Sequence, residues 1–443
     1  MTQNELGYTP EEYRKFCRHG LGYLILFSML YMSLYCCRLN LPNAAPAFLE
    51  RGFTKPDIGI FTSALFWAYA IGQIFNGRLA ETFGATRFVV VSVALSIVAN
   101  LFFGLQSSLI VMTIIWGVNG YVQSMAWVPG ISNIARWFPG KRRGFAMGFA
   151  DAFSGLGQGA ATLSVAAALS LLPSLGWKAA FFLPPVFPAV MLLIFVLFAR
   201  DCPAAVGLKD YAEPNPDTAA AETEMKRLIA EKGFFYPYRH VLSDRTFLLW
   251  LLICFLIGMV RYGLTIWIPL YFVERFDIDI TKGLLQSLAL PLGMGLGALT
   301  VPTLTDRLCP GNRLPAVMVS AVAGAVVIES FVLITPDSAF MLVLAELLLF
   351  LAGFCVYSAC GTIWAFAADM GGRVFGGTCS GVLNFGAYMG AAVQSIVYGF
   401  LLDQKGWPWV FMTIAGFCAA ISLLAFLHTL TNKLIKKDAE KGA

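Results

Sequence analysis

The sequence predicts an all-α membrane protein with twelve transmembrane helices, arranged as two six-helix bundles related by duplication. Of its 443 residues, 58% are hydrophobic and only 13% are charged. That balance lies outside the range of soluble domains and is typical of a chain that folds in a bilayer. In addition, twelve long apolar stretches occur along the chain, and a single long polar segment divides them into six and six.

Each apolar stretch is long enough to cross a hydrocarbon core of roughly 30 Å as a helix. The stretches lie at about residues 20–50, 57–80, 88–107, 108–137, 144–172, 177–200, 246–275, 283–306, 313–335, 338–368, 374–403 and 407–432. The polar segment contains AEPNPDTAAAETEMKRLIAEKG. We therefore expect an N-terminal bundle over 1–200, a cytoplasmic central loop over 201–245 and a C-terminal bundle over 246–443.

The distribution of basic residues predicts that both termini are cytoplasmic. With the N-terminus inside, 23 of the 31 Lys and Arg residues fall in inner segments, six fall in outer segments and two lie within spans. The net charge of +5 follows from this asymmetry, so it does not indicate a nucleic-acid partner. The ten Cys residues lack the spacing of a metal site, and we expect neither a metal nor a cofactor.

Three landmarks recur at a nearly constant offset, which indicates an internal duplication. Gly176-Trp177 recurs as Gly406-Trp407 after 230 residues, the acidic loop 78–81 recurs at 303–306 after 225, and Arg38 recurs as Arg261 after 223. In transporters built from repeats, substrates bind near the bilayer midplane where the repeats meet. We therefore expect the two arginines to face each other across such a site.

Arg38 and Arg261 are the strongest candidates for functional residues. Each lies in the middle of an apolar segment, where a charge costs roughly 2.5 to 3.5 kcal/mol on insertion. Both lie too far from the start of their segments for the side chain to reach the headgroups, so a structural ion pair is the main alternative. Two guanidinium groups match the oxygens of a phosphate monoester by bidentate contacts, which predicts a small anionic substrate.

Several stretches resemble one known family. They are YCCRLN at 35–40 with Pro46, GRLAETFG at 77–84, NGYVQ at 119–123 with Trp127 and Pro129, and RYG at 261–263 with Trp267, Pro269 and Tyr271. Together with the six-plus-six pattern, they resemble the major facilitator superfamily and, within it, the organophosphate:phosphate antiporters, such as the bacterial glycerol-3-phosphate and hexose-6-phosphate transporters. The resemblance implies a monomer in the inner membrane that exchanges a phosphorylated metabolite for inorganic phosphate by alternating access.

Further residues are expected to line the same cavity. Gln73 and Ser154 occupy the positions where the family has a lysine and a histidine, so the resemblance implies fewer cations in this cavity. The aromatic residues expected to contact the organic part of the substrate are Tyr31, Tyr35, Trp127, Tyr262 and Trp267. Gln123 is expected to bind the substrate as well, and Asn384 and Tyr388 are expected to line the cavity on the second half. Ordinary helix packing is the competing interpretation of each aromatic residue. The glycines at 155, 157, 159, 386 and 390 are expected to permit close helix approach.

Two other functions remain open on the sequence. The first is a proton-coupled symporter of an organic acid such as a sugar acid, since the first span also resembles the anion:cation symporters. Those proteins have an aspartate immediately before the arginine and a glutamate in the fourth span, whereas this chain has Cys37 and Gln123. Proton coupling would then depend on Glu329 or Glu346, whose competing interpretation is a protonated structural residue.

Asp151 lies just after a pair of loop arginines and is expected to form an ion pair with one of them rather than to take part in transport.

The remaining function is a membrane sensor of sugar phosphates. Such a sensor is expected to carry an additional signalling domain in the cytoplasm.

Overall fold

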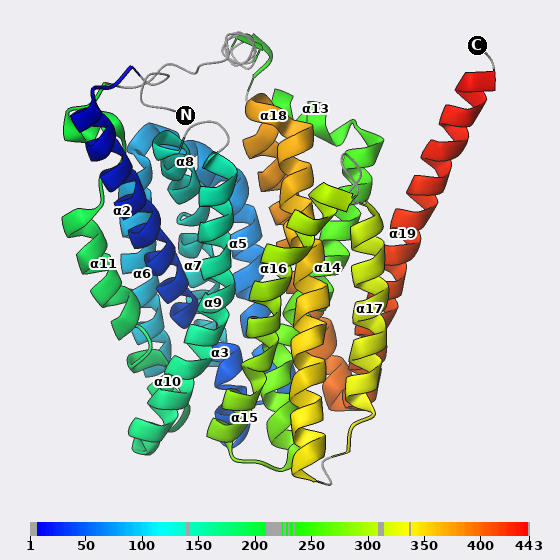
Figure 1. Ribbon diagram of the computed structural model, residues 1–443. Coiled ribbons are helices and arrows are strands. Elements are labelled where there is room, and N and C mark those ends of the chain that lie inside the picture. Colours follow the sequence, from blue (N-terminus) through cyan, green and yellow to red (C-terminus); the bar gives the residue numbers. More distant parts are fainter. Residues whose placement is uncertain are drawn as a thin grey trace. The chain divides into compact units, whose positions relative to one another are not determined.

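The computed structural model describes residues 7–138, 142–209, 235–308, 314–335 and 338–441, together with residues 224, 227, 228 and 231–233. Every regular element among them is helical (Figure 1). Eleven helices of the described chain are long and apolar enough to cross a membrane. The remaining predicted span, 283–306, corresponds to α15 (Ile280–Ser287) and α16 (Ala289–Leu308). The predicted fold class is confirmed.

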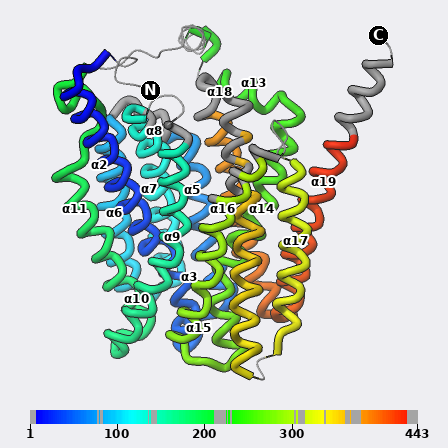
Figure 2. Tube along the Cα trace, viewed as in Figure 1, coloured from blue at the N-terminus to red at the C-terminus, as the bar shows by residue number. Residues whose placement is uncertain are grey.

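The chain divides into two compact units, whose path is traced in Figure 2. Unit 1 comprises Met1–Pro237 and Asp279–Leu285, and unit 2 comprises Tyr238–Ile278 and Gln286–Ala443. The change from one unit to the other at 237 lies within the expected central loop.

Unit 1 contains the first six spans. Its elements are α2 (Pro10–Leu34), η1 (Tyr35–Cys37), α3 (Asn40–Asn43), α4 (Ala45–Leu49), α5 (Lys55–Phe83), α6 (Ala85–Leu105), α7 (Leu109–Gln123), α8 (Trp127–Trp137), α9 (Arg142–Leu171), η2 (Pro173–Lys178), α10 (Ala179–Phe182), α11 (Val186–Phe198) and η3 (Pro203–Val206). A capping box starts α2: the Thr9 hydroxyl accepts from the Glu12 amide, and the Glu12 carboxylate accepts from the Thr9 amide at 2.8 Å.

The first and fourth spans of unit 1 are interrupted helices, and each of these two interruptions lies four residues before a proline. The first span breaks between η1 and α3, where Pro42 has no N–H to donate to the carbonyl of Arg38. The fourth span breaks between α7 and α8, and the ring of Pro129 is incompatible with a helical carbonyl at Met125. The first break contains Arg38, and Gln123 is the last residue before the second.

Unit 2 contains the last six spans, except that most of α15, at the start of the eighth span, belongs to unit 1. Its further elements are α13 (Tyr236–Leu242), which begins at the unit boundary, α14 (Arg245–Phe276), α17 (Leu314–Val332), α18 (Ala339–Lys405) and α19 (Trp407–Lys441). A straight helix of 67 residues would measure about 100 Å, far more than a bilayer requires. Accordingly α18 holds two candidate spans, 339–359 and 378–405, which run in opposite directions in Figure 1.

Glycines bring the same pairs of spans together in both units. In unit 1, Gly157 of α9 lies against the carbonyl of Met32, and in unit 2, Gly390 of α18 lies against the carbonyl of Phe255. Met32 and Phe255 are 223 residues apart, the same offset that relates Arg38 to Arg261. The predicted close approach is therefore confirmed at residues 157 and 390, and Gly386 packs on Leu251 in the same way.

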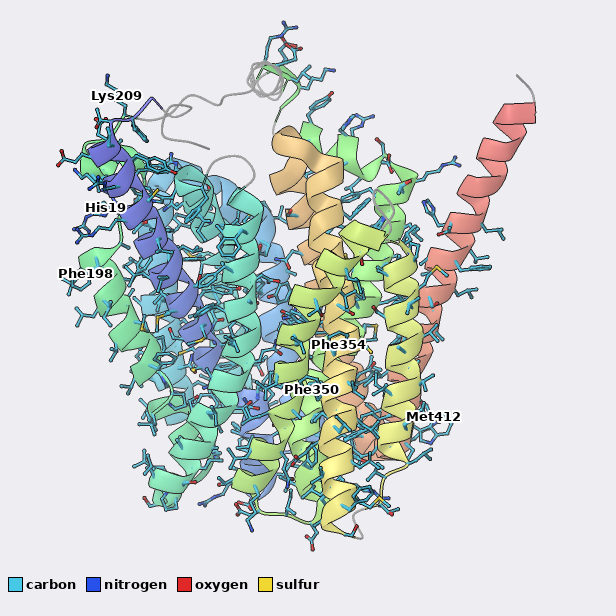
Figure 3. All side chains as sticks on the ribbon, viewed as in Figure 1. His19, Phe198, Lys209, Phe350, Phe354 and Met412 are labelled. Carbon is cyan, nitrogen blue, oxygen red and sulfur yellow. The ribbon has the colours of Figure 1, made fainter. Side chains whose placement is uncertain are left out.

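A second glycine pair repeats the packing of the second span on the fourth. Gly120 of α7 lies against the carbonyl of Leu65 on α5, and Gly353 of α18 lies against the carbonyl of Leu290 on α16. On the other side of this contact, the carbonyls of Phe350 and Phe354, both labelled in Figure 3, face Gly293 and Gly297 of α16. The repeated contacts confirm two bundles of the same internal arrangement.

An aromatic cluster is also duplicated, and it joins the first, third and sixth spans of each unit. It consists of Phe48, Phe103, Trp177 and Phe181 in unit 1 and of Tyr271, Phe331, Trp407 and Phe411 in unit 2. The Phe48 and Trp177 ring centroids are 4.5 Å apart, and the Tyr271 and Trp407 centroids are 5.0 Å apart. The glycine before each tryptophan has a positive φ, 55° at Gly176 and 79° at Gly406, which a residue with a side chain rarely adopts.

Candidate anion-binding site

The guanidinium group of Arg38 lies at the first helix break, buried among polar and aromatic side chains. Only 2% of the residue is exposed, and its Nε donates a hydrogen bond of 2.7 Å to Oε1 of Gln123. The Arg38 Cζ atom lies 4.8 Å from the ring centroid of Tyr35 and 4.7 Å from that of Tyr69, which is within the range of cation–π attraction. Tyr31 lies slightly farther away, at 6.0 Å.

Side-chain amides hold the backbone immediately before Arg38. Interrupting a helix removes the i+4 donor from its last carbonyl groups. The Cys37 carbonyl instead accepts hydrogen bonds from Asn100 at 3.1 Å, Asn119 at 2.8 Å and Gln123 at 2.9 Å. The donors come from α6 and α7, so three segments of unit 1 meet at this carbonyl.

These amides bond to one another as well. The Ser96 hydroxyl donates to Asn119 Oδ1 at 2.7 Å and accepts from Gln123 Nε2 at 2.9 Å, and Asn40 Nδ2 donates to Asn100 Oδ1 at 2.8 Å. We call these five residues, Asn40, Ser96, Asn100, Asn119 and Gln123, the amide network. All five are fully buried. Buried polar groups are tolerated when they are hydrogen-bonded to one another in this way.

Arg261 occupies the matching position in unit 2 but lies on an unbroken helix. It is a residue of α14, half-buried, and its Cζ atom lies 4.8 Å from the ring centroid of Tyr262 and 4.4 Å from that of Tyr357. The Tyr262 ring in turn lies 5.6 Å from the ring of Tyr388 on α18. Each arginine is therefore flanked by two tyrosine rings at less than 5 Å, a recurrence that matches the duplication.

The structure places some of the predicted site residues around each arginine. In unit 1, Tyr31, Tyr35 and Gln123 surround Arg38, and Trp127 packs on Tyr31 with 4.6 Å between ring centroids. In unit 2, Tyr262 contacts Arg261, and Tyr388 contacts Tyr262. Trp267 and Asn384 are buried on α14 and α18, at 1% and 8% exposure.

Gln73 and Ser154, the two residues expected in the positions of the family's cations, bond to nearby helix backbone. Gln73, buried on α5, donates from Nε2 to the carbonyl of Ser124 at 3.3 Å, at the break between α7 and α8. Ser154, buried on α9, donates to the carbonyl of Asp151 at 2.7 Å and lies 3.2 Å from the Asp151 carboxylate. Asp151 thus has a hydroxyl neighbour one turn away, while its expected partners, Arg142 and Arg143, have side chains outside the described set.

Glu329 and Glu346 are half-buried and lie beside the lipid-facing surface of unit 2. On α17, Glu329 falls between Val326 and Leu333, which are 61% and 80% exposed. On α18, Glu346 directly precedes Leu347, which is 53% exposed. Exposed apolar residues at helical spacing mark the side of a membrane helix that meets lipid. Figure 3 shows the same kind of exposure at Phe198 and Met412, on the outer sides of α11 and α19.

Sequence reasoning missed Tyr69, Tyr357 and most of the amide network. A usable signal existed for the network, because Ser92, Ser96 and Asn100 follow one another at intervals of four and so place polar groups on one side of an apolar helix. Tyr69 and Tyr357 gave no such signal, since aromatic residues are common throughout the spans and only the fold shows which of them contact an arginine.

The chemistry available at both arginines is anion recognition. A guanidinium group is always charged and presents pairs of N–H donors that match two oxygens of a phosphate, sulfonate or carboxylate. Tyrosine rings beside it add an apolar surface and hydroxyl groups for the remainder of a ligand. Among the described residues, no group of three or more His, Cys, Asp and Glu side chains is placed to hold a metal ion.

Comparison with known proteins identifies the family. Residues 23–395 match the Major Facilitator Superfamily. A probable hexose phosphate transport protein of Chlamydia trachomatis serovar D is 27% identical over 420 residues, covering 91% of this chain and 90% of that protein. The glycerol-3-phosphate transporter of Bacillus subtilis is 27% identical over 412 residues, 89% of each chain. A probable sulfoacetate transporter of Cupriavidus necator is 27% identical over 429 residues, 93% of each chain.

These relatives are membrane transporters, so the expectation of a transporter rather than an enzyme is confirmed, as is the resemblance to the organophosphate:phosphate antiporter group. The family match covers most of the sequence and agrees with the two bundles of repeated internal packing. The chain is a member of the major facilitator superfamily.

Proposed function

We propose that this protein is a secondary transporter that exchanges a small phosphorylated metabolite, such as a sugar phosphate or glycerol phosphate, for inorganic phosphate by alternating access. The observation that carries the proposal is an arginine flanked by tyrosine rings at the matching position of each unit. The names of the hexose phosphate and glycerol-3-phosphate relatives support the same substrate class.

Charge balance supports a phosphate monoester. Such a group carries nearly two negative charges, which two guanidinium groups neutralise by charge-assisted hydrogen bonds. The proposal assigns Arg38 and Arg261 to the phosphoryl oxygens. It assigns Tyr31, Tyr35, Trp127, Tyr262, Trp267, Asn384 and Tyr388 to the organic part, with Gln73 and Ser154 as neutral groups in the positions of the family's cations.

The same charges favour exchange over one-way transport. Removing guanidinium groups from water is unfavourable, and a bound anion offsets that penalty. A transporter of this kind closes more readily around an anion than without one, so it returns with phosphate after releasing the organophosphate. No proton carrier is required by this cycle.

Two further functions give different results in the same assay. A symporter of an organic acid is favoured by one observation, the similarity to the probable sulfoacetate transporter, because sulfoacetate bears a sulfonate and a carboxylate. Glu329 and Glu346 are half-buried and lie beside the lipid-facing surface, which does not favour a role for them in proton coupling. The third function, a sugar-phosphate sensor, requires binding without transport.

Counterflow into proteoliposomes separates the three functions. Vesicles loaded with inorganic phosphate are expected to take up labelled glucose 6-phosphate or glycerol 3-phosphate much faster than empty vesicles, with little effect from collapsing a proton gradient. Uptake of an organic acid driven by the gradient, with no stimulation by internal phosphate, would establish the symporter. Binding without uptake would establish the sensor.

The proposed setting is the cytoplasmic membrane of a bacterium, with both termini inside and the protein as a monomer. The bacterial relatives and the basic residues of the inner connections support this orientation. No nucleic acid or cofactor enters the proposal.

A further inference from the structure

The two units can be compared position by position, because matching contacts give the offset for each span. Arg38 and Arg261 differ by 223. Phe103 and Phe331, which occupy the same place in the aromatic clusters, differ by 228. Gly120 and Gly353, which pack on matching carbonyls, differ by 233.

The buried positions of the helices agree with these offsets. On α6 the buried set includes Val89, Ser92, Val93, Ser96, Asn100 and Phe103, and on α17 it includes Val317, Ser320, Ala321, Gly324, Ile328 and Phe331. Each member of the second set follows its counterpart by 228 residues. These six pairs establish the register between the third and ninth spans from Val89 to Phe103.

At these offsets, all five polar residues of the amide network correspond to small or apolar residues in unit 2. Asn40 corresponds to Gly263, Ser96 to Gly324, Asn100 to Ile328, Asn119 to Ala352 and Gln123 to Val356. The counterparts are buried as well. Unit 2 thus packs its spans in the same pairs without the network, so the shared fold does not require it.

What differs between the units is the helix that carries the arginine. In unit 1 the helix is interrupted at Arg38, and the network donates three hydrogen bonds to the Cys37 carbonyl at the break. In unit 2, α14 continues through Val260 and Arg261 as a regular helix, whose carbonyls are satisfied along the backbone. The amide network therefore occurs in the unit whose arginine-bearing helix is interrupted, and it is not a general feature of both bundles.

We propose, on the basis of the function proposed above, that Asn100 and Asn119 are positioning residues that fix the guanidinium group of Arg38 for anion binding. They hold the Cys37 carbonyl, and through it the peptide that bears Arg38. Gln123 shares that carbonyl and also accepts from Arg38 Nε, which fixes one edge of the guanidinium.

Two consequences follow for recognition. Because Nε is bonded to Gln123, a two-point contact to an anion is made through the edge formed by Nη1 and Nη2. Arg38 is therefore pre-organised, which limits the conformational entropy lost on binding.

The test measures inorganic phosphate binding by the purified full-length protein, using two variants that copy unit 2, Asn119→Ala and Asn100→Ile. The matched control is Asn133→Ala. Asn133 is an equally buried asparagine that bonds α8 to α6 through the Thr86 hydroxyl at 3.1 Å, outside the network. Two quantities are recorded for each protein: its melting temperature without ligand and the phosphate Kd of the folded protein.

The Kd is expected to rise by about tenfold or more in the network variants, because a small displacement of a binding group has large effects, and by less than about twofold in Asn133→Ala. A purely structural role predicts lower melting temperatures with an unchanged Kd. Equal Kd changes in Asn119→Ala and Asn133→Ala, wild-type Kd values in both network variants, or failure of both to fold would each overturn the proposal.

The outcome for the wild-type protein separates this inference from the proposed function. If it binds no phosphate but binds a sulfonate or carboxylate, the phosphate function is wrong, and the same comparison with that anion still decides the role of the network. If it binds none of these anions, both proposals fail.

Discussion

Arg38 and Arg261 share a position in their units and a pair of tyrosine neighbours, but the surroundings of their backbones differ. The peptide before Arg38 is held by side chains from two other helices, whereas the peptide before Arg261 is part of a regular helix. The Arg38 side chain is buried, whereas that of Arg261 is half-buried. Substrate recognition is therefore tested by substitutions of single residues.

Conservative substitution of the arginines is expected to abolish most binding. Arg38→Lys and Arg261→Lys keep the charge, but an ammonium group cannot form the planar two-point contact, so phosphate affinity is expected to fall by about tenfold or more. Alanine variants are expected to be at least as damaging and to remain folded. Isothermal titration measures the phosphate affinity of the lysine and alanine variants, with Arg200→Lys at an exposed position as the control. Normal phosphate exchange by either alanine variant would contradict the assignment.

A carboxylate in place of the Gln123 amide is expected to compete with the substrate. Gln123→Glu keeps the shape of the side chain but places a negative charge 2.7 Å from Arg38 Nε, where it would neutralise the guanidinium. Loss of a charge-assisted contact to the anion corresponds to about 1.5 to 3 kcal/mol. Gln123→Met, which is uncharged, serves as the comparison. We expect phosphate affinity in the order Gln, Met, Glu, and equal affinity of the Glu and Met variants would show that charge is not the cause.

At the scale of elements, prolines and glycines determine how the spans differ. Pro42 and Pro129 each interrupt a helix four residues earlier, and these two breaks bring Arg38 and Gln123 together. Glycines on α7, α9 and α18 allow backbones to touch at the same places in both units. The breaks in the first and fourth spans are therefore particular to unit 1, while the close contacts are common to both units.

The close contacts lead to a prediction about stability. A methyl group on Gly120 would clash with the carbonyl of Leu65, so Gly120→Ala is expected to lower the free energy of unfolding by about 1 to 3 kcal/mol. Gly148, on α9, has open space around it, and Gly148→Ala is expected to be neutral or to stabilise its helix by up to about 1 kcal/mol. Thermal unfolding in detergent distinguishes them, and equal melting temperatures would show that α5 and α7 do not pack this closely.

The sequence was sufficient for the spans, because hydropathy and length alone define a membrane helix. It was also sufficient for the two arginines, since a charge inside an apolar span stands out without any structure. The partners of those arginines were not predictable in the same way. Tyr69 is brought to Arg38, and Asn100 to the Cys37 carbonyl, by tertiary packing between spans, and the sequence does not indicate these contacts. Gln123 was predicted to be a site residue, but its hydrogen bond to Arg38 Nε was not predicted.

For the whole molecule, duplication and charge asymmetry define the arrangement in the membrane. The offsets between matching positions grow from 223 at the first span to 233 at the fourth and fall to 230 at the sixth. Within a span the offset is constant, as the buried faces of α6 and α17 show. Length differences between the halves are thus confined to the connections, and the basic residues of those connections predict the orientation.

Orientation is testable with single cysteines at exposed sites. Ser243→Cys, just before α14, is expected to react with a membrane-impermeant maleimide only after cells are permeabilised, because it lies on the basic side that is predicted to be cytoplasmic. Glu50→Cys, at the end of α4, is expected to react in intact cells. The unmodified protein provides the background, since its described cysteines are all buried or half-buried. Reversed labelling would invert the predicted topology.

The composition of the amide network has one more consequence, for the response of the transporter to acidity. Its members are four amides and a hydroxyl, groups that neither gain nor lose a proton under physiological conditions. The guanidinium that they hold stays charged as well. Acidification therefore leaves the charge of Arg38 and of the amide network unchanged, so neither contributes to the pH dependence of anion binding, whereas the ionisation of the ligand does. A phosphate monoester, whose second proton dissociates near a pH of about 6, would bind more weakly below that value, while a sulfonate would not.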